Sequence, residues 1–279
     1  MTDAAPLWFD PALCLIDGRW QAPAGGETLP LTNPSDGSPL CQIARGDARD
    51  IDAAVAAAKA AFPAWAAKPM EERITLLKGL AKIYKERRAE MAEAMRMEMG
   101  APHDLALNSQ WGAGAWHMAG FLDALSEFEA ETAYKGVDRT RLEPIGVCAL
   151  ITPWNWPMNQ VVLKVFPALA VGCTVVLKPS EIAPLSSLLF AEMVHDAGIP
   201  AGVFNLVNGD GVGVGSQLSS HPDVDMISFT GSTRAGIAIS KAAADTLKRV
   251  SLELGGKGAN IVFADADEKA VKRGVQHCM

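Results

Sequence analysis

The stretch between residues 145 and 254 alternates between two kinds of segment, and this alternation limits the folds that the chain can adopt. Short apolar runs, rich in β-branched residues, predict strands at 145–151, 174–177, 203–207, 226–229 and 251–254. Longer segments with helical patterns lie between them, at 157–171, 184–197, 212–220 and 235–248. Repeated β-α units of this kind predict an α/β protein in which helices cover both faces of a parallel sheet.

The residues before this region are predicted to be mainly helical, over 50–67, 70–99 and 101–130. In the first of these segments, Ile51, Val55 and Trp65 fall on one helical face. Residues 134–143 alternate and are charged, which predicts one exposed strand. Residues 13–16 form a short strand candidate before an Asp17-Gly18 turn.

Composition and charge argue against several classes of protein. The chain of 279 residues is 49% hydrophobic, and its net charge is -7 without a basic stripe, which argues against a nucleic-acid partner. The most apolar stretch, 146–177, is interrupted by prolines and a lysine, so we expect no membrane span. The cysteines form no C-x-x-C pair, so no metal site is predicted, and their sparse use fits a reducing compartment. Residues 1–6 lack the basic and apolar regions of a signal peptide, and we therefore expect a cytoplasmic protein.

The carboxyl ends of parallel strands are where such sheets bind ligands, and each predicted strand end carries an unusual turn. After the first strand, Pro153 and Pro157 fix a loop that holds Asn155 rigidly. The Asn155 amide is suited to donate to a developing oxyanion, but the residue could equally be the N-cap of the next helix. After the second strand, Lys178 and Glu181 could bind a ribose diol or could form a solvated surface pair.

The next three turns are rich in glycine or carry a carboxylate. The Asn208-Gly209-Asp210-Gly211 turn and Gly215 follow the third strand and open a helix, the context of a phosphate-binding turn or of a plain tight turn. The Phe229-Thr230-Gly231-Ser232 turn could take a pyrophosphate through its N–H groups and hydroxyls, or could simply cap the helix that follows. Glu253, at the end of the last strand, is expected to be partly buried, either as a general base or as the partner of Lys257 or Lys178.

Taken in this order, the five turns resemble the NAD(P)-dependent aldehyde dehydrogenase superfamily. The resemblance also includes Lys164, the 167–170 segment and the N-terminal helices, so it covers almost the whole chain. One motif alone would be weak evidence, but the ordered set is highly specific. The matching stretches are Pro153-Trp154-Asn155-Trp156-Pro157, Lys178-Pro179-Ser180-Glu181, Phe229-Thr230-Gly231-Ser232 and Leu252-Glu253-Leu254-Gly255-Gly256-Lys257.

Members of this family oxidise an aldehyde to a carboxylic acid. A cysteine thiolate attacks the carbonyl, hydride passes to the nicotinamide, and an activated water hydrolyses the thioester. The resemblance implies that Asn155 donates to the oxyanion, that Glu253 activates the water, and that Lys164 supports the active site.

The resemblance also implies an NAD site in this chain. Because the Glu181 carboxylate disfavours a ribose 2′-phosphate, NAD is expected ahead of NADP, in a family of which some members use both. The residues implied in cofactor binding are Ile151, Thr152, Pro153, Trp154, Lys178, Ser180, Glu181, Gly211, Gly215, Phe229, Thr230, Gly231, Ser232, Gly236, Leu254 and Gly255.

A domain organisation follows from the same resemblance. Residues 1–131 and 147–254 would form a Rossmann-like NAD-binding domain, residues 132–146 an oligomerisation strand, and residues 255–279 the start of a catalytic domain, with a strand at 259–263. The family's Gly-Gln-x-Cys nucleophile would lie beyond Met279. The Gln276-His277-Cys278 segment lacks the preceding glycine, so we expect Cys278 to lie on a helix and not to be the nucleophile.

We therefore expect the amino-terminal part of a longer homo-oligomeric enzyme that acts on a small-molecule aldehyde, with this part inactive alone. One alternative is a non-catalytic NAD-binding module that has no dehydrogenase activity. Another is a related reductase of acyl phosphates, and the intact Glu253 argues against it because such enzymes need no hydrolytic base.

Overall fold

The computed structural model describes residues 9–278, and of residues 276–278 only the backbone. The segment 1–6, on which the expectation of no signal peptide rests, and the side chain of Cys278 lie outside the described residues. Within the described part of the chain, no helix combines the length and the hydropathy that a membrane span requires.

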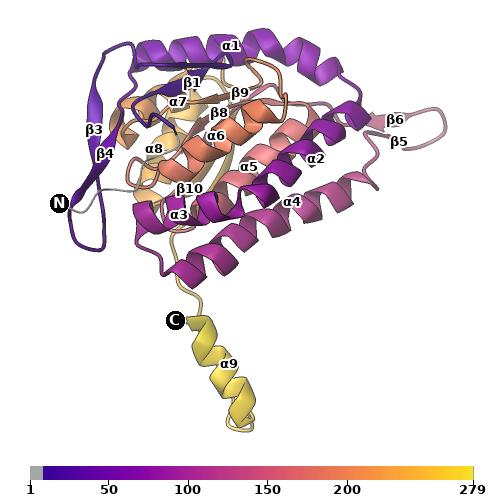
Figure 1. The fold of residues 1–279 in the computed structure, drawn as a ribbon. Helices are drawn as coiled ribbons and strands as arrows, with labels where there is room; N and C mark the ends of the chain where they lie inside the picture. Colours follow the sequence, from indigo (N-terminus) through magenta and orange to yellow (C-terminus); the bar gives the residue numbers. More distant parts are fainter. Residues whose placement is uncertain (1–8, 279) are drawn as a thin grey trace.

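A seven-stranded sheet forms the centre of the molecule, in the order β11-β10-β7-β8-β9-β1-β2 (Figure 1). The five predicted strands are confirmed, and each pairs in parallel with its neighbour in this order. The amino-terminal strand β1 extends the sheet by pairing antiparallel with β9. The tight Asp17-Gly18 turn then brings β2 back along β1, so these two strands are also antiparallel. The strand bounds are β1 Cys14–Ile16, β2 Arg19–Gln21, β7 Val147–Ile151, β8 Thr174–Lys178, β9 Phe204–Leu206, β10 Met226–Gly231 and β11 Arg249–Leu254.

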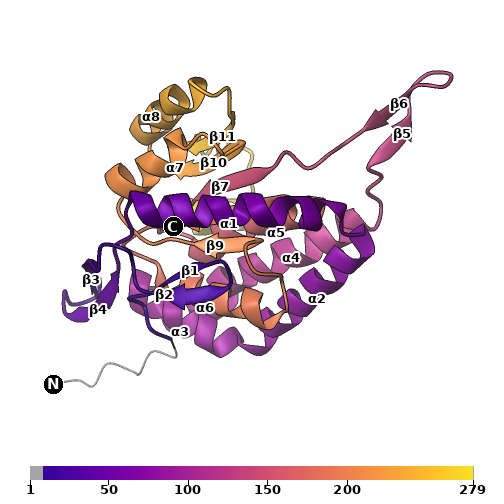
Figure 2. The same ribbon diagram turned by 90° about the horizontal axis from the view of Figure 1, so that it is seen from above.

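Helices cover both faces of this sheet, as expected (Figure 2). Alternate residues of β7 divide between two cores. Cys148 and Leu150 belong to the core under α2 to α6, whereas Val147, Ala149 and Ile151 belong to the core under α1, α7 and α8. Because both faces of β7 are covered, all its residues are buried and the strand is continuously apolar. The helices between the strands are α5 Pro157–Val171, α6 Leu185–Asp196, the π-helix η2 Gly211–Gly215, α7 Ser216–Ser220 and α8 Thr233–Ala244.

The amino-terminal helices differ from the prediction in two places. The helix predicted over 70–99 is interrupted at Arg87, which leaves helical geometry. The Arg87 guanidinium binds both Glu90 and Glu192, so the break lets α3 turn and pack along α6. The helix predicted from residue 101 begins instead as a short π-helix, η1. The observed bounds are α1 Ala48–Ala67, α2 Met70–Glu86, α3 Arg88–Met99, η1 Leu105–Gln110 and α4 Trp111–Leu125.

Two hairpins lie apart from the central sheet. The first pairs β3 (Thr28–Thr32) with β4 (Pro39–Ala44). The second pairs β5 (Glu131–Ala133) with β6 (Arg139–Arg141) and projects from the body of the molecule (Figure 2). The prediction of one strand over 134–143 is therefore wrong. A turn closed by the N–H of Tyr134 on the carbonyl of Asp138, at 2.9 Å, folds the segment back so that β6 pairs with β5.

The carboxyl-terminal segment leaves the body of the molecule after β11 (Figure 1). Residues 259–263, predicted as a strand, form none, because no neighbouring strand within residues 9–278 pairs with them. The apolar side chains of Ile261, Val262 and Phe263 are exposed. The segment ends in α9 (Glu268–Cys278), which confirms a helix at Cys278.

A buried carboxylate, Glu98, joins the end of α3 to the start of α6. It is 2% exposed and accepts hydrogen bonds from the N–H groups of Leu185 and Ser186 and from the Ser186 hydroxyl. Burial raises the pKa of the Glu98 carboxyl to about 7, and the three hydrogen bonds only partly offset this effect. The folded chain therefore keeps a proton on Glu98 at pH values where the unfolded chain has released it.

We expect the stability contributed by this proton to be present in mild acid and to be lost as the pH rises towards about 7. The loss should amount to about 3 kcal/mol of unfolding free energy, and Glu98→Gln should abolish it because the amide does not titrate. Urea unfolding at about pH 5 and about pH 8 measures the difference. Glu86→Gln, an exposed position on α2, is the control. A Glu98→Gln profile parallel to that of the wild type would contradict the assignment.

Candidate functional site

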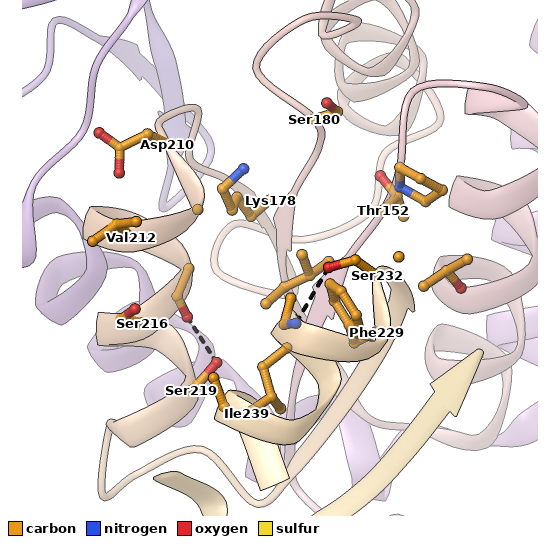
Figure 3. Close-up of a pocket in the computed structure, with 18 of the residues that line it drawn as sticks. Thr152, Lys178, Ser180, Asp210, Val212, Ser216, Ser219, Phe229, Ser232 and Ile239 are labelled. Atoms are coloured by element: carbon orange, nitrogen blue, oxygen red, sulfur yellow. Dashed lines mark hydrogen bonds between the residues drawn. The ribbon is translucent and has the colours of Figure 1, made fainter. Parts of the chain in front are cut away.

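A pocket of about 770 Å³ opens at the carboxyl ends of β7, β8 and β10. Figure 3 shows its position between α7 and α8, with Lys178 at one end and Phe229 and Ile239 at the other. Most residues implied in cofactor binding line this pocket. They are Ile151, Thr152, Pro153, Trp154, Lys178, Ser180, Glu181, Gly211, Gly215, Phe229, Thr230, Gly231 and Ser232.

Three of the implied residues do not line the pocket: Gly236, Leu254 and Gly255. Gly236 lies where α8 crosses β11, and a Cβ built on it would come within 2.7 Å of Leu254 Cδ2. The absence of a side chain at Gly236 therefore serves the packing of α8 on the sheet. Gly255 begins the exposed segment that follows β11.

Lys178 is a buried cation at the end of β8. Its side chain is only 3% exposed, and its ammonium donates to the carbonyl of Pro179 at 2.9 Å and to Glu181 Oε2 at 3.2 Å. The interpretation of Lys178 and Glu181 as a solvated surface pair is therefore wrong for the lysine. Burial lowers the pKa of Lys178, while the charges of Glu181 and Asp210 oppose this shift. Lys178 thus brings an amino group to the wall of the pocket, where Glu181 is its partner.

The glycine-rich turn after β9 opens a helix, as predicted, and brings a further carboxylate to the pocket. Asp210 is the N-cap of η2 and accepts a hydrogen bond from the N–H of Gly213. Gly215 lies against the Lys178 side chain, 3.8 Å from its Cδ. No role of its own was predicted for Asp210, although an aspartate directly before a helix is typical of an N-cap.

The turn after β10 caps α8 and also lines the pocket. Ser232 Oγ accepts a hydrogen bond from the N–H of Ala235 at 3.2 Å, so the capping interpretation is correct. The neighbouring Thr230 hydroxyl is buried and has no hydrogen-bond partner among the described residues. A buried polar group without a partner costs free energy, so this oxygen is a candidate contact for a ligand. Three residues of α8 also line the pocket and were not predicted from the sequence: Arg234, Ala238 and Ile239.

Asn155 lies in the turn between β7 and α5, and it is exposed. The N-cap of α5 is Trp156, without a side-chain capping bond, so the alternative of Asn155 as the N-cap is wrong. The backbone carbonyl of Asn155 accepts a hydrogen bond from Gln110 Nε2 at 3.3 Å. The Asn155 side-chain amide remains accessible at the edge of the sheet where the pocket opens.

Lys164 and Glu253 lie near each other, on α5 and β11. Lys164 is 9% exposed, and its ammonium donates to Ser228 Oγ on β10 at 3.0 Å. Burial lowers the pKa of Lys164, and the negative charge of Glu253 opposes this shift.

The expectation that Glu253 is partly buried is wrong, because its side chain is exposed. β11 is the last strand of the sheet order, so only β10 lies beside it and one side of the strand is open. The pairing of Glu253 with Lys257 or Lys178 is also not observed among the ion pairs of the described residues, and Lys178 binds Glu181 instead.

The described cysteines lie away from the pocket. Cys148 and Cys173 belong to the core, and each is 3% exposed. Burial raises the pKa of the Cys14 thiol to about 12 and that of Cys41 to about 11. Cys14 and Cys41 are therefore thiols at neutral pH and are poor nucleophiles.

Comparison with known proteins identifies the family. The sequence profile of the aldehyde dehydrogenase family matches residues 20–279. The chain belongs to the aldehyde dehydrogenase family. It is 50% identical, over 266 residues, to the 3-succinoylsemialdehyde-pyridine dehydrogenase of a Pseudomonas species, and this match covers 95% of the chain and 56% of the relative.

Solved aldehyde dehydrogenase structures share the fold. The enzyme from Bartonella henselae is 53% identical with a TM-score of 0.93, and the match covers 95% of this chain and 56% of that one. Aldehyde dehydrogenase C from Pseudomonas syringae, crystallised as a variant with NAD+ and octanal, is 49% identical with a TM-score of 0.93 over 95% of this chain and 55% of that one. The chain spans about half the length of the relatives it matches.

Proposed function

We propose that this chain forms the cofactor-binding part of an enzyme that oxidises a small-molecule aldehyde to a carboxylic acid with NAD(P). The observation that carries the proposal is the pocket at the strand ends, where a buried lysine faces a glycine-rich turn and a capped helix start. This is the arrangement in which parallel sheets hold dinucleotides. The NAD+ complex of the Pseudomonas syringae relative supports the same assignment.

The residues of the pocket suit a dinucleotide. Lys178 and Glu181 offer a donor and an acceptor for the two hydroxyls of a ribose. The first N–H groups of α8 and the unpartnered Thr230 hydroxyl offer donors for a pyrophosphate or a carboxamide. A bound nicotinamide ring would supply the hydride acceptor. The Glu181 carboxylate favours NAD+ over NADP+ because it repels an added phosphate.

Three residues next to the pocket would serve the chemistry of the carbonyl. We propose that the Asn155 amide donates to the oxygen that gains negative charge, which lowers the energy of the transition state. The Glu253 carboxylate would take a proton from the attacking water, and Lys164 would hold that carboxylate by its charge. The projecting β5–β6 hairpin, within the segment 132–146, would carry contacts between subunits of a homo-oligomer.

Isothermal titration of the chain with NAD+ tests the cofactor assignment. We expect one site with a dissociation constant between about 1 μM and about 1 mM. Adenosine without phosphates should bind far more weakly, because it offers no negative charge to the amino terminus of α8. If a folded, monodisperse preparation gives no saturable heat with NAD+, the proposal is wrong.

A further inference from the structure

Four charged side chains line the pocket, and three of them are already bound within the protein. The ammonium of Lys178 donates to Glu181 Oε2 at 3.2 Å. The carboxylate of Asp210 accepts from the Arg45 guanidinium at 3.2 Å. The fourth side chain, Arg234, is exposed and takes part in no ion pair between the residues that the structure describes. Within the described wall of the pocket, its guanidinium is therefore the cation left to bind an anion.

Arg234 is an unfavourable residue for the place that it occupies. It lies in the first turn of α8, two residues after the N-cap Ser232, and that turn contains no acidic residue. The amino terminus of a helix carries partial positive charge, so acidic side chains stabilise it and a cation does not. A residue that weakens its own helix and also lines a pocket is a candidate for function, because ligand binding offsets the local cost.

Backbone donors lie beside this side chain at the start of α8. The N–H of Ala235 is bound to Ser232 Oγ, a contact that Figure 3 shows as a dashed line. The N–H groups of Thr233 and Arg234 have no acceptor among the described residues, as is usual in the first turn of a helix. The buried Thr230 hydroxyl, in the same pocket, also lacks a partner there. An anion at this place would meet these donors together with the guanidinium.

We propose that Arg234 is a cofactor-binding residue whose guanidinium binds the pyrophosphate of the dinucleotide. This inference rests on the proposed function, because it concerns the same pocket, and it adds a charged side chain to the donors already assigned there. A guanidinium suits a phosphate well, because two of its parallel N–H groups can each donate to a phosphate oxygen. Since Arg234 extends from the start of α8, it can reach an anion that the backbone N–H groups of that turn hold.

Replacing Arg234 by glutamine tests this role. Glutamine keeps a hydrogen-bond donor at this position but removes the charge. In titrations at low salt, NAD+ and ADP, which share the pyrophosphate, should each bind about tenfold more weakly to Arg234→Gln than to the wild type. The melting temperature without ligand should stay the same or rise, because a cation is removed from a helix amino terminus. An arginine with only a structural role would not give these two results together.

Two further variants separate a direct contact from a general effect of charge. Arg234→Lys keeps the cation but loses the bidentate geometry, so its affinity for NAD+ should fall by only about threefold. Arg249→Gln is the matched control: Arg249 is also exposed, forms no ion pair with a described residue, and lies outside the pocket. This variant removes the same charge from the chain, so its affinities for NAD+ and ADP should equal those of the wild type.

The outcomes separate the inference from the proposed function. If the wild-type chain binds no NAD+, the proposed function fails, and the role of Arg234 fails with it. If the chain binds NAD+ but the affinity of Arg234→Gln is within about twofold of the wild type, the inference alone is wrong. The inference is also wrong if ADP is unaffected, or if Arg249→Gln weakens binding as much, because the effect would then come from another contact or from net charge.

Discussion

Replacing Lys178 by methionine should weaken NAD+ binding by at least about thirtyfold, because a charged hydrogen-bond donor to a ribose inside a pocket is worth about 2 kcal/mol. The ammonium lies almost entirely out of water, so it acts at low dielectric, where its contacts are strong. Glu181 would also lose its partner and would add an uncompensated negative charge beside the ligand.

The same substitution should leave the fold intact. Methionine has nearly the volume of lysine, and the aliphatic part of Lys178 already packs against Gly215. Removing a buried charge also removes the cost of its burial, so the melting temperature should stay the same or rise. Loss of binding together with an unchanged melting curve would therefore locate the effect in the pocket.

Lys248→Met is the matched control for this experiment. Lys248 is also largely buried, at 8% exposed, and burial lowers its pKa, but it bonds to Thr246 and lies outside the pocket. Titration of both variants with NAD+ should give a large loss for Lys178→Met and none for Lys248→Met. An NAD+ affinity of Lys178→Met within about threefold of the wild type would remove Lys178 from the site.

Replacing Arg73 by methionine should reduce the free energy of unfolding by about 4 kcal/mol, because four carbonyl groups at helix ends would lose a charged hydrogen-bond donor. Arg73 is 5% exposed, and its guanidinium donates to carbonyl groups at the ends of two helices. The acceptors are Ala170 at 3.0 Å, Trp65 and Ala66 at 3.4 Å each, and Lys68. No short side chain could reach all four.

The helices joined in this way are α1 and α5, which cover opposite faces of the sheet, so the loss should weaken both cores at once. Chemical unfolding in urea measures it directly. Arg96→Met provides the comparison: Arg96 forms an exposed ion pair with Glu93 on α3, and its loss should cost less than about 0.5 kcal/mol. A cost below about 1 kcal/mol for Arg73→Met would show that water satisfies these carbonyl groups.

The order of strands and helices could be predicted from the sequence because each element has a local cause. Residues 147–151 and 174–178 are continuously apolar, as strands buried on both faces must be. Pro157 and Gly172 mark the two ends of α5, through the fixed φ of proline and a left-handed backbone at Gly172. Errors arose where pairing decides the structure: residues 134–141 turn back on themselves, and residues 259–263 lack a neighbouring strand.

The environment of the site residues could not be predicted in the same way. Lys178 and Glu253 both follow apolar runs, yet one is buried and the other is exposed. The difference comes from their places in the sheet: β8 lies between β7 and β9, whereas β11 is the last strand. The residues that flank Lys178 and Glu253 in the sequence do not indicate whether each strand lies in the middle of the sheet or at its edge.

The sequence by itself determined the α/β fold, the family and the positions of most pocket residues, because these depend on local periodicity and on short motifs at strand ends. Only the tertiary structure decided which charged groups meet. Arg45 and Asp210 are 165 residues apart, and they meet because α1 and η2 pack beside each other on one face of the sheet. Burial and electrostatic environment are properties of such distant contacts, so they emerge only when the chain is folded.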